Sequence, residues 1–148
     1  LEEAYRAGRL KAIGVSNFNA SRYEAFLRAC TVIPAVNQVE AHIFFQQRGL
    51  LEEMKKHGTH MQAWSPFAAG KNDFFSNPVL RALGLAHNKT PAQIALKYLV
   101  QLGISVIPKS SHRERMRENL GIFDFQLPDE DMQRIRALDG GKTLFGWY

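Results

Sequence analysis

The sequence contains one cysteine, Cys30, among its 148 residues, so an internal disulfide is excluded. A single free thiol is typical of a protein that works in a reducing compartment, although a small secreted protein without disulfides would look the same. We therefore expect a cytoplasmic protein. No segment approaches the ~20 consecutive apolar residues of a transmembrane helix, so we expect no membrane insertion.

The best-known nucleotide-binding loops are absent. No G-x-G-x-x-G turn occurs, so a dinucleotide would have to bind without the Rossmann loop. The segment DGGKT, residues 139–143, ends like a P-loop, but Arg136 stands where the leading glycine is required. None of the 5 histidines has a cysteine or glutamate at the spacing of metal ligands. We therefore expect structural histidines and no metal.

The composition is that of one ordinary globular domain, with 45% apolar and 22% charged residues. Lys and Arg number 19 against 14 Asp and Glu, which gives a net charge of +5. This balance favours an anionic partner such as a nucleotide, an acidic metabolite or nucleic acid. Nucleic acid is the least favoured of these, because the sequence has no basic surface interleaved with aromatics and no recognisable binding module.

Apolar runs alternate with amphipathic segments along the chain. Leu50, Leu51 and Met54 recur at helical spacing, and Thr90 followed by Pro91 is typical of a helix start. The predicted strands lie within residues 10–18, 34–40, 59–67 and 104–110, and the main predicted helices within 19–30, 46–58, 79–88, 90–103, 112–120 and 127–140. Strands that alternate with helices in this way indicate βαβ units around a parallel sheet.

Positive charge is concentrated where the last predicted strand passes into a helix. Ser111, with Glu114 three residues later, fits a capping box and predicts that the helix begins at His112. The free backbone N–H groups of such a helix start, beside Lys109 and Arg115, suit a phosphate group. A solvated helix stabilised by ion pairs along its own surface is equally compatible with this segment.

Polar side chains also follow the other predicted strands. Ser16 and Asn17 come just after the first apolar run, Gln38 lies in the second, and Trp64 and Ser65 close the third. In barrel enzymes the carboxyl ends of the strands carry the binding groups. Two amides beside a flat aromatic ring could hold a planar ring that bears a carboxamide. Taken singly, each of these residues is more often a loop cap or a core residue.

The segments AIGVSNF, PAVNQVE, AWSPF, IPKSSHRERMREN and FDFQLPDEDMQRIRALD together resemble the C-terminal half of the aldo-keto reductases, most closely the bacterial 2,5-diketogluconate reductase type. The similarity follows the family order and spacing over essentially the whole chain, residues 1–148. It implies an α/β fold, the (β/α)8 TIM barrel, of which this chain supplies the C-terminal half with about four strands and their helices. It also implies an oxidoreductase that reduces aldehydes or ketones by hydride transfer from NADPH.

The resemblance implies roles for individual residues at the nicotinamide end of the cofactor. Ser16, Asn17 and Gln38 would hold the nicotinamide carboxamide, and Trp64 would stack on the ring where many relatives have tyrosine. The residues that would follow the pyrophosphate are Ser65, Pro66 and Phe67.

The resemblance also explains the positive charge after the last strand, because a 2′-phosphate distinguishes NADPH from NADH. Lys109, Ser110, Ser111 and Arg115 would take this phosphate and its ribose. Glu118 and Asn119 would contact the adenine. Phe145 and Trp147 would line the pocket of a small carbonyl substrate.

The chain departs from the family in its catalytic residues. The family's Asp, Tyr, Lys and His lie in the N-terminal half of the barrel, which this sequence does not include. Tyr5, Tyr23 and Tyr98 lie on predicted helices, Tyr148 is terminal, and Ile43 stands where the family usually has proline. We therefore expect this chain to be inactive by itself.

A half-barrel leaves two sheet edges open, which invites pairing with another chain or segment. We expect an N-terminal half-barrel, in the same polypeptide or in a second chain, to complete it. Leu1 in place of methionine fits a longer polypeptide of about 250 residues or more, and two copies associated edge to edge are the other possibility. A noncatalytic nucleotide-binding or regulatory barrel protein remains the alternative function.

Overall fold

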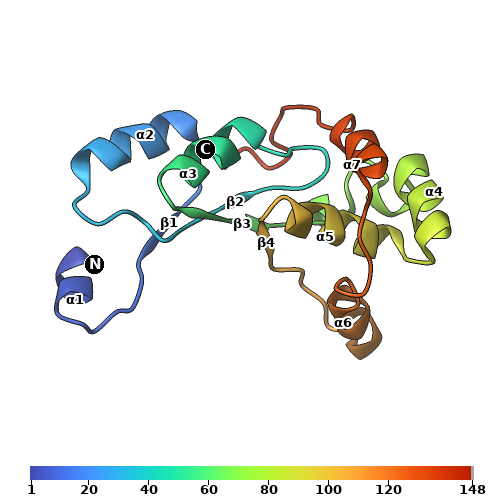
Figure 1. Ribbon diagram of the computed structural model, residues 1–148, viewed down its shortest axis with the longest axis horizontal. Helices are drawn as coiled ribbons and strands as arrows, with labels where there is room; N and C mark the ends of the chain where they lie inside the picture. Colours follow the sequence, from blue (N-terminus) through green and yellow to red (C-terminus); the bar gives the residue numbers. More distant parts are fainter. Residues whose placement is uncertain (148) are drawn as a thin grey trace.

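The computed structural model describes residues 1–147 and consists of alternating strands and helices (Figure 1). In chain order the elements are α1 (Glu2–Arg6), β1 (Gly14–Ser16), α2 (Ala20–Ala29), β2 (Val36–Glu40), α3 (Arg48–Lys56), β3 (His60–Trp64), η1 (Ala68–Gly70), η2 (Phe74–Ser76), α4 (Pro78–His87), α5 (Pro91–Gln101), β4 (Ser105–Val106), α6 (Arg113–Leu120) and α7 (Asp129–Arg136). Each predicted strand and main helix is therefore present. The segment between β3 and α4 contains the two short 3-10 turns η1 and η2.

The 4 strands form one parallel sheet in the order β1-β2-β3-β4, which confirms the predicted βαβ architecture. The register places Ser16 opposite Gln38, Gln38 opposite Gln62, and Gln62 opposite Ser105. Because directly paired residues of neighbouring strands point to the same side, these polar residues form one row across the sheet. β1 and β4 are the edge strands of the sheet within the described residues.

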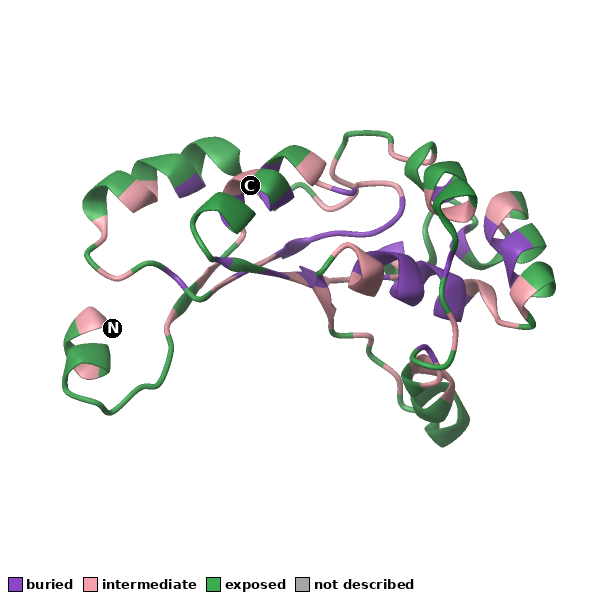
Figure 2. Cartoon of the chain, in the orientation of Figure 1, coloured by how far each residue is buried: buried purple, intermediate pink, exposed green. Residues whose placement is uncertain are grey.

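The two faces of the sheet differ in character. Val39, Met61 and Ala63 are almost completely buried, whereas Gln38 and Gln62, which alternate with them, are partly exposed. Figure 1 shows α2 and α3 above the sheet and α5 beside β4, and Figure 2 shows that burial concentrates in β2, β3, α5 and the segment after β2. One face therefore forms the core with the helices, and the other carries the row of polar side chains.

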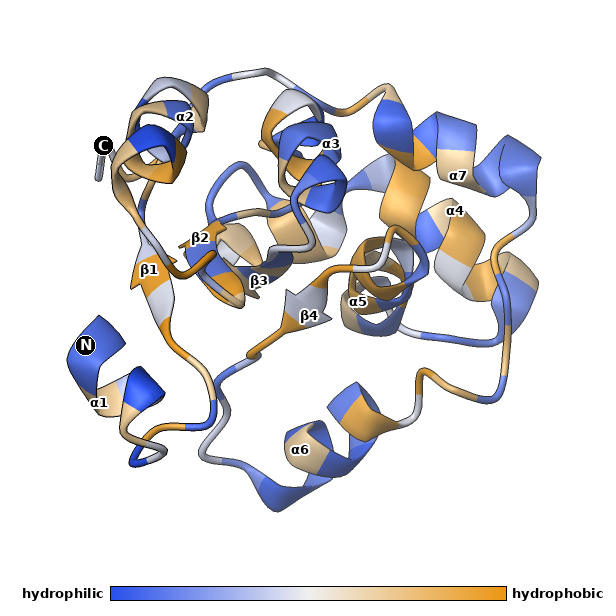
Figure 3. Ribbon diagram, turned by 60° about the vertical axis from the view of Figure 1, so that its left-hand side comes forward, coloured by the Kyte–Doolittle hydropathy of each residue, from blue (hydrophilic) through white to orange (hydrophobic). Residues whose placement is uncertain are grey.

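The predicted core face of α3 is correct. On α3, Leu50, Leu51 and Met54 are buried, and on α5 the buried residues include Ile94 and Leu99. In contrast, α6 has no buried residue, and Figure 3 shows its largely hydrophilic colouring. α6 therefore adds little to the core, so its polar side chains are available for other contacts.

The start of α5 agrees with the sequence prediction. The Thr90 hydroxyl accepts the backbone N–H of Gln93, and the Gln93 side chain accepts the backbone N–H of Thr90, with Pro91 in the first turn. This is a complete capping box, worth about 1 kcal/mol relative to alanine at the cap.

Within the described residues no helix is long and apolar enough to cross a membrane.

The start of α6 differs from the prediction. The helix begins at Arg113 with His112 as its cap residue, and no side chain provides a capping hydrogen bond there. The capping box predicted from Ser111 and Glu114 is therefore wrong. The turn before the helix is closed instead by Ser110, whose Oγ accepts the backbone N–H of His112 at 3.1 Å. The helix therefore starts one residue later than predicted.

Candidate functional site

A pocket of about 520 Å³ lies between the turn after β4, the first turn of α5 and the segment after β3. The structure brings together here the residues predicted for the phosphate and adenine, together with one residue predicted to follow the pyrophosphate. These are Lys109, Ser110, Ser111, Arg115, Glu118, Asn119 and Phe67. Residues from three separate segments of the chain thus share one pocket.

The position of α6 against α5 shapes this pocket. The Thr90 hydroxyl donates to Glu118 Oε1 at 2.5 Å, and Gln93 Nε2 donates to the backbone oxygens of Glu118 and Gly121, each at 3.0 Å. The capping residues of α5 therefore also hold the C-terminal end of α6. One oxygen of the Glu118 carboxylate is already bound by Thr90. Glu118 therefore helps to hold α6 against α5, in addition to its predicted contact with the adenine.

The chemistry of the lining suits a ligand that is both anionic and aromatic. Lys109 and Arg115 supply positive charge, and arginine in particular binds phosphate through paired hydrogen bonds. Phe67 and Phe75 contribute aromatic rings whose centroids are 5.8 Å apart, and Phe75 is 52% exposed. A flat heteroaromatic base could pack on such a half-exposed ring.

Five residues that line this pocket were not predicted from the sequence as site residues: Phe75, Thr90, Pro91, Ala92 and His112. Thr90 was assigned only a capping role, and Phe75 lies in a loop without a periodic pattern. His112 was predicted to lie inside the helix, whereas it is the cap residue and lines the pocket. The proximity of Phe75 to Arg115 depends on the packing of the segment after β3, which no local signal in the sequence indicates.

A second group of predicted residues meets at the carboxyl ends of β1, β2 and β3. Ser16 Oγ and the Asn17 backbone N–H both donate to the backbone oxygen of Gln38, each at 2.9 Å. Trp64 Nε1 donates to Asn17 Oδ1 at 2.7 Å. Asn17 has a φ of 57°, a left-handed conformation that asparagine adopts more readily than most residues. The turn after β1 thus directs the Asn17 side chain to the end of β3.

These bonds define which polar atoms are left for a ligand. The Asn17 oxygen is taken by Trp64, so its Nδ2 is the atom that could donate to a ligand. Gln38 Nε2 donates to Gln62 Oε1 at 2.6 Å, which leaves Gln38 Oε1 as an acceptor. One donor and one acceptor match a primary carboxamide, which has one oxygen and one NH2 group.

The segment from Ser65 to Phe67 connects the two groups of residues. Ser65 is left-handed with a φ of 51°, so the chain turns sharply at the end of β3. Pro66 is buried, and Phe67 lines the pocket beside α6. Of these predicted residues, Ser65 and Phe67 are partly exposed, whereas Pro66 packs into the fold.

The C-terminal tail reaches the end of β3. The ring centroid of Phe145 lies 5.3 Å from that of Trp64, and the ring centroid of Trp147 lies 6.2 Å from it. Trp147 remains 64% exposed. Both residues predicted for the substrate pocket therefore lie against the residue predicted to stack on the nicotinamide. Tyr148 lies outside the described residues.

The buried tyrosines serve the fold. The Tyr23 hydroxyl donates to Thr59 Oγ1 at 2.6 Å, and the Tyr98 hydroxyl donates to Gln46 Oε1 at 2.7 Å. Burial raises the pKa of Tyr98 to about 12. Neither phenol is placed to give a proton to a ligand at the strand ends, and Tyr5 lies on α1.

The chain is similar to one family of known proteins. The sequence model described as "Aldo/keto reductase family" matches residues 1–140. A 9,11-endoperoxide prostaglandin H2 reductase of Trypanosoma cruzi is 40% identical over 147 residues, which cover 99% of this chain and 52% of that protein. The oxidoreductase YtbE of Bacillus subtilis is 42% identical over 139 residues, which cover 94% of this chain and 49% of that protein.

Solved structures agree with this similarity. An aldo-keto reductase from a deep-sea metagenome library is 39% identical with a TM-score of 0.93, covering 97% of this chain and 54% of that one. A mutant of Gox0644 in complex with NADPH is 40% identical with a TM-score of 0.87, covering 93% of this chain and 50% of that one. The chain therefore spans about half the length of the relatives it matches.

Proposed function

Because the chain belongs to the aldo/keto reductase family, we propose that it is the cofactor-binding half of a cytoplasmic, NADPH-dependent reductase of small aldehydes or ketones. One observation carries this proposal: the cationic and hydroxyl side chains predicted for a 2′-phosphate line a single pocket with aromatic rings. A nucleotide with an additional phosphate is the ligand that this combination fits.

The phosphate end of the pocket would decide between NADPH and NADH. Lys109 and Arg115 would bind the 2′-phosphate by charge-assisted hydrogen bonds, with the hydroxyls of Ser110 and Ser111 beside them. Barrel enzymes frequently place a phosphate site after their last strands, near the N-terminus of a helix, and this pocket has that position. The adenine would lie near Glu118 and Asn119.

The residues at the strand ends would orient the nicotinamide. NADPH, when bound, supplies the hydride for the carbonyl carbon. Asn17 Nδ2 and Gln38 Oε1 would hold the carboxamide from both of its groups, while the oxygen of Ser16 would add a second acceptor. Trp64 would stack on the ring, and its bond to Asn17 limits the rotation of the indole.

None of the tyrosines among residues 1–147 is placed to protonate the alcohol product, so we propose that the proton donor comes from outside this chain. Tyr23 and Tyr98 are buried and bound to core residues, so they cannot reach a substrate at the strand ends. Catalysis would therefore need the N-terminal half of the barrel, in the same polypeptide or in a second chain, and the short chain alone would not turn over carbonyl compounds.

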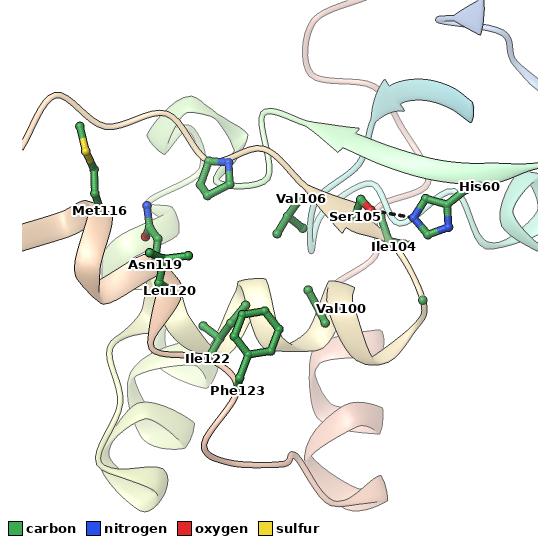
Figure 4. Close-up of a pocket in the computed structure, with 12 residues that line it drawn as sticks. His60, Val100, Ile104, Ser105, Val106, Met116, Asn119, Leu120, Ile122 and Phe123 are labelled. Atoms are coloured by element: carbon green, nitrogen blue, oxygen red, sulfur yellow. Dashed lines mark hydrogen bonds between the residues drawn. The ribbon is translucent and has the colours of Figure 1, made fainter. Parts of the chain in front are cut away.

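An apolar pocket of about 640 Å³ beside β4 supports the proposal of a second half-barrel (Figure 4). Its lining includes Ile104 and Val106 at β4, and also Leu120 and Phe123. Leu120 and Phe123 are both 71% exposed. Large exposed apolar side chains next to an open strand edge are typical of a surface that another part of the protein covers. A strand and a helix of the missing half would fit there.

The proposal is tested by titrating the protein with NADPH and NADH and following tryptophan fluorescence, since Trp64 lies at the predicted nicotinamide site. We expect NADPH to bind more tightly than NADH by about tenfold or more, because the 2′-phosphate adds charge-assisted hydrogen bonds. Equal affinity for the two cofactors would contradict the phosphate assignment. Carbonyl-dependent oxidation of NADPH by a polypeptide with both halves, without turnover by this chain alone, would distinguish the reductase from a noncatalytic nucleotide-binding protein.

A further inference from the structure

A buried carboxylate that the nucleotide site does not use holds the C-terminal tail. Glu40, the last residue of β2, has no exposed surface. Its Oε1 accepts the backbone N–H of Leu144 at 2.7 Å, and its Oε2 accepts the hydroxyl of Thr143. The same Oε1 lies 3.0 Å from Nε2 of His42. The carboxylate of a strand end is thus bound to a segment more than a hundred residues away.

His42 contributes to this arrangement as a neutral hydrogen-bond donor. Its Nδ1 accepts the backbone N–H of Phe44 at 3.3 Å, so the ring proton lies on Nε2 and faces Glu40. Burial lowers the pKa of His42 despite the nearby carboxylate, which keeps the ring neutral. His42 therefore satisfies Glu40 and keeps the carboxylate turned toward the tail.

The burial of Glu40 requires an explanation because an unpaired buried carboxylate is strongly destabilising. Three donors satisfy it: the ring of His42, the hydroxyl of Thr143 and the backbone N–H of Leu144. Two of these donors belong to the tail. If the tail left, both of those bonds would be lost while the bond to His42 stayed. The energetics of Glu40 therefore favour a docked tail.

A lysine holds the tail from the other side. Lys71 Nζ donates to the backbone oxygen of Leu144 at 2.9 Å, and the same ammonium lies 4.2 Å from the centroid of the Phe145 ring. Within the tail, Thr143 Oγ1 accepts the backbone N–H groups of Phe145 and Gly146 at 3.1 and 2.8 Å. The direction of Phe145 is therefore determined by bonds on both sides of it.

We propose that Glu40 is a positioning residue, which seats residues 143–146 at the end of β3 so that Phe145 and Trp147 form a wall beside Trp64. We refer to Glu40, His42 and Lys71 as the tail clamp. The identity of this wall as part of a carbonyl pocket rests on the proposed function. The clamp itself rests only on the contacts of its three residues.

Limited proteolysis with trypsin tests the clamp, because Lys142 immediately precedes the clamped residues and is exposed. Cleavage after Lys142 requires the following residues to leave Glu40, so its rate follows the population of undocked tail. The fragment 1–142 is quantified by mass spectrometry. The bond after Lys11, in the exposed segment between α1 and β1, is the internal reference for trypsin activity in each sample.

Two variants weaken the clamp from opposite sides. Glu40→Gln removes the negative charge, and Thr143→Val removes the tail hydroxyl with little change in shape. We expect each to accelerate cleavage after Lys142 by about tenfold or more, since each weakens a hydrogen bond to a charged group. Cleavage after Lys11 should not change. Near-UV circular dichroism should lose the contribution of the ring contacts that Phe145 and Trp147 make with Trp64, while the far-UV spectrum stays the same.

Matched controls separate the clamp from a general loss of stability. Glu52→Gln makes the same chemical change at a side chain on α3 that is 66% exposed, and it should leave cleavage after Lys142 unchanged. Thr143→Ser restores the hydroxyl and should keep cleavage slow. Equal rates in Thr143→Val and the unmodified chain would overturn the proposal. A parallel acceleration after Lys11 would do the same.

The outcome does not depend on nucleotide binding. If Glu40→Gln does not fold, Thr143→Val with its serine control decides the question, because Thr143 lies on the tail and not in the sheet. A chain that binds neither NADPH nor NADH but shows the expected cleavage pattern would refute the proposed function and retain the clamp. The opposite pattern would retain the proposed function and refute the clamp.

Discussion

The indole Nε1 of Trp64 donates a hydrogen bond of 2.7 Å to Oδ1 of Asn17, which lies 47 positions earlier in the sequence. This bond joins the ends of β3 and β1 across the end of β2. It orients the indole and at the same time makes Nδ2 the outward donor of Asn17. One hydrogen bond therefore orients both the Trp64 indole, predicted to stack on the nicotinamide, and the Asn17 amide, predicted to bind the carboxamide.

We expect Trp64→Phe to lower the free energy of unfolding by about 1 kcal/mol or more, because Asn17 Oδ1 loses its donor and ring contacts are lost. Urea unfolding measures this change. Trp147→Phe is the matched control, because its side chain is 64% exposed and the substitution should leave the free energy nearly unchanged. Equal effects of the two substitutions would show that the bond to Asn17 does not contribute.

We expect Lys109→Ala and Arg115→Ala each to weaken NADPH binding by about tenfold or more, while NADH binding changes much less. The reason is that both side chains line the pocket predicted for the 2′-phosphate. Arg113→Ala removes a nearby arginine of α6 that does not line this pocket, and it serves as the charge-matched control. A similar loss of affinity for NADPH and NADH would place the 2′-phosphate elsewhere.

Thr90 links the stability of α5 to the position of α6. We expect Thr90→Val to lower the free energy of unfolding by about 1 kcal/mol, because the capping box is lost. NADPH binding should also weaken, because the bond from Thr90 to Glu118 is lost with it. Thr90→Ser keeps the hydroxyl and should restore both properties. Unfolding and titration measured on the same samples would reveal whether the two effects separate.

Stability should depend on pH through His42. Burial lowers its pKa in the folded protein below the ordinary value of 6.5, so the unfolded chain takes up a proton first as the pH falls. The contribution of His42 is therefore complete above about pH 6.5 and decreases below it, by at most about 1.4 kcal/mol per pH unit, until the folded pKa is reached. We expect His42→Gln to flatten this part of the profile. An unchanged slope in the variant would exclude His42 as the cause.

Local features of the sequence predicted the elements well. The spacing of Leu50, Leu51 and Met54 predicted the buried face of α3, and Thr90 predicted the start of α5. These signals work because helix periodicity and capping depend on residues only a few positions apart. The predicted cap at Ser111 is wrong, because Ser111 forms no capping hydrogen bond whereas Ser110 accepts the backbone N–H of His112; the sequence alone does not distinguish two adjacent serines.

The arrangement of the candidate site depended on contacts that local patterns do not contain. Phe75 lies in a segment of short turns, and it lines the pocket of Arg115 because that segment packs against α5. Glu40 was not singled out from the sequence, since a glutamate after an apolar run usually faces solvent. Its role became visible only when the tail was seen to supply its donors.

The sequence by itself determined the alternation of strands and helices, the charge at the last turn and the chemical groups that a nucleotide would need. Only the tertiary structure decided which of these groups meet, as with Asn17 and Trp64 or with Glu40 and Thr143, which are 103 positions apart. The physical reason is the distance along the chain over which each kind of interaction acts. Backbone preferences and side-chain periodicity act over one or two turns, whereas the burial of a carboxylate is tolerated only where packing brings distant donors to it.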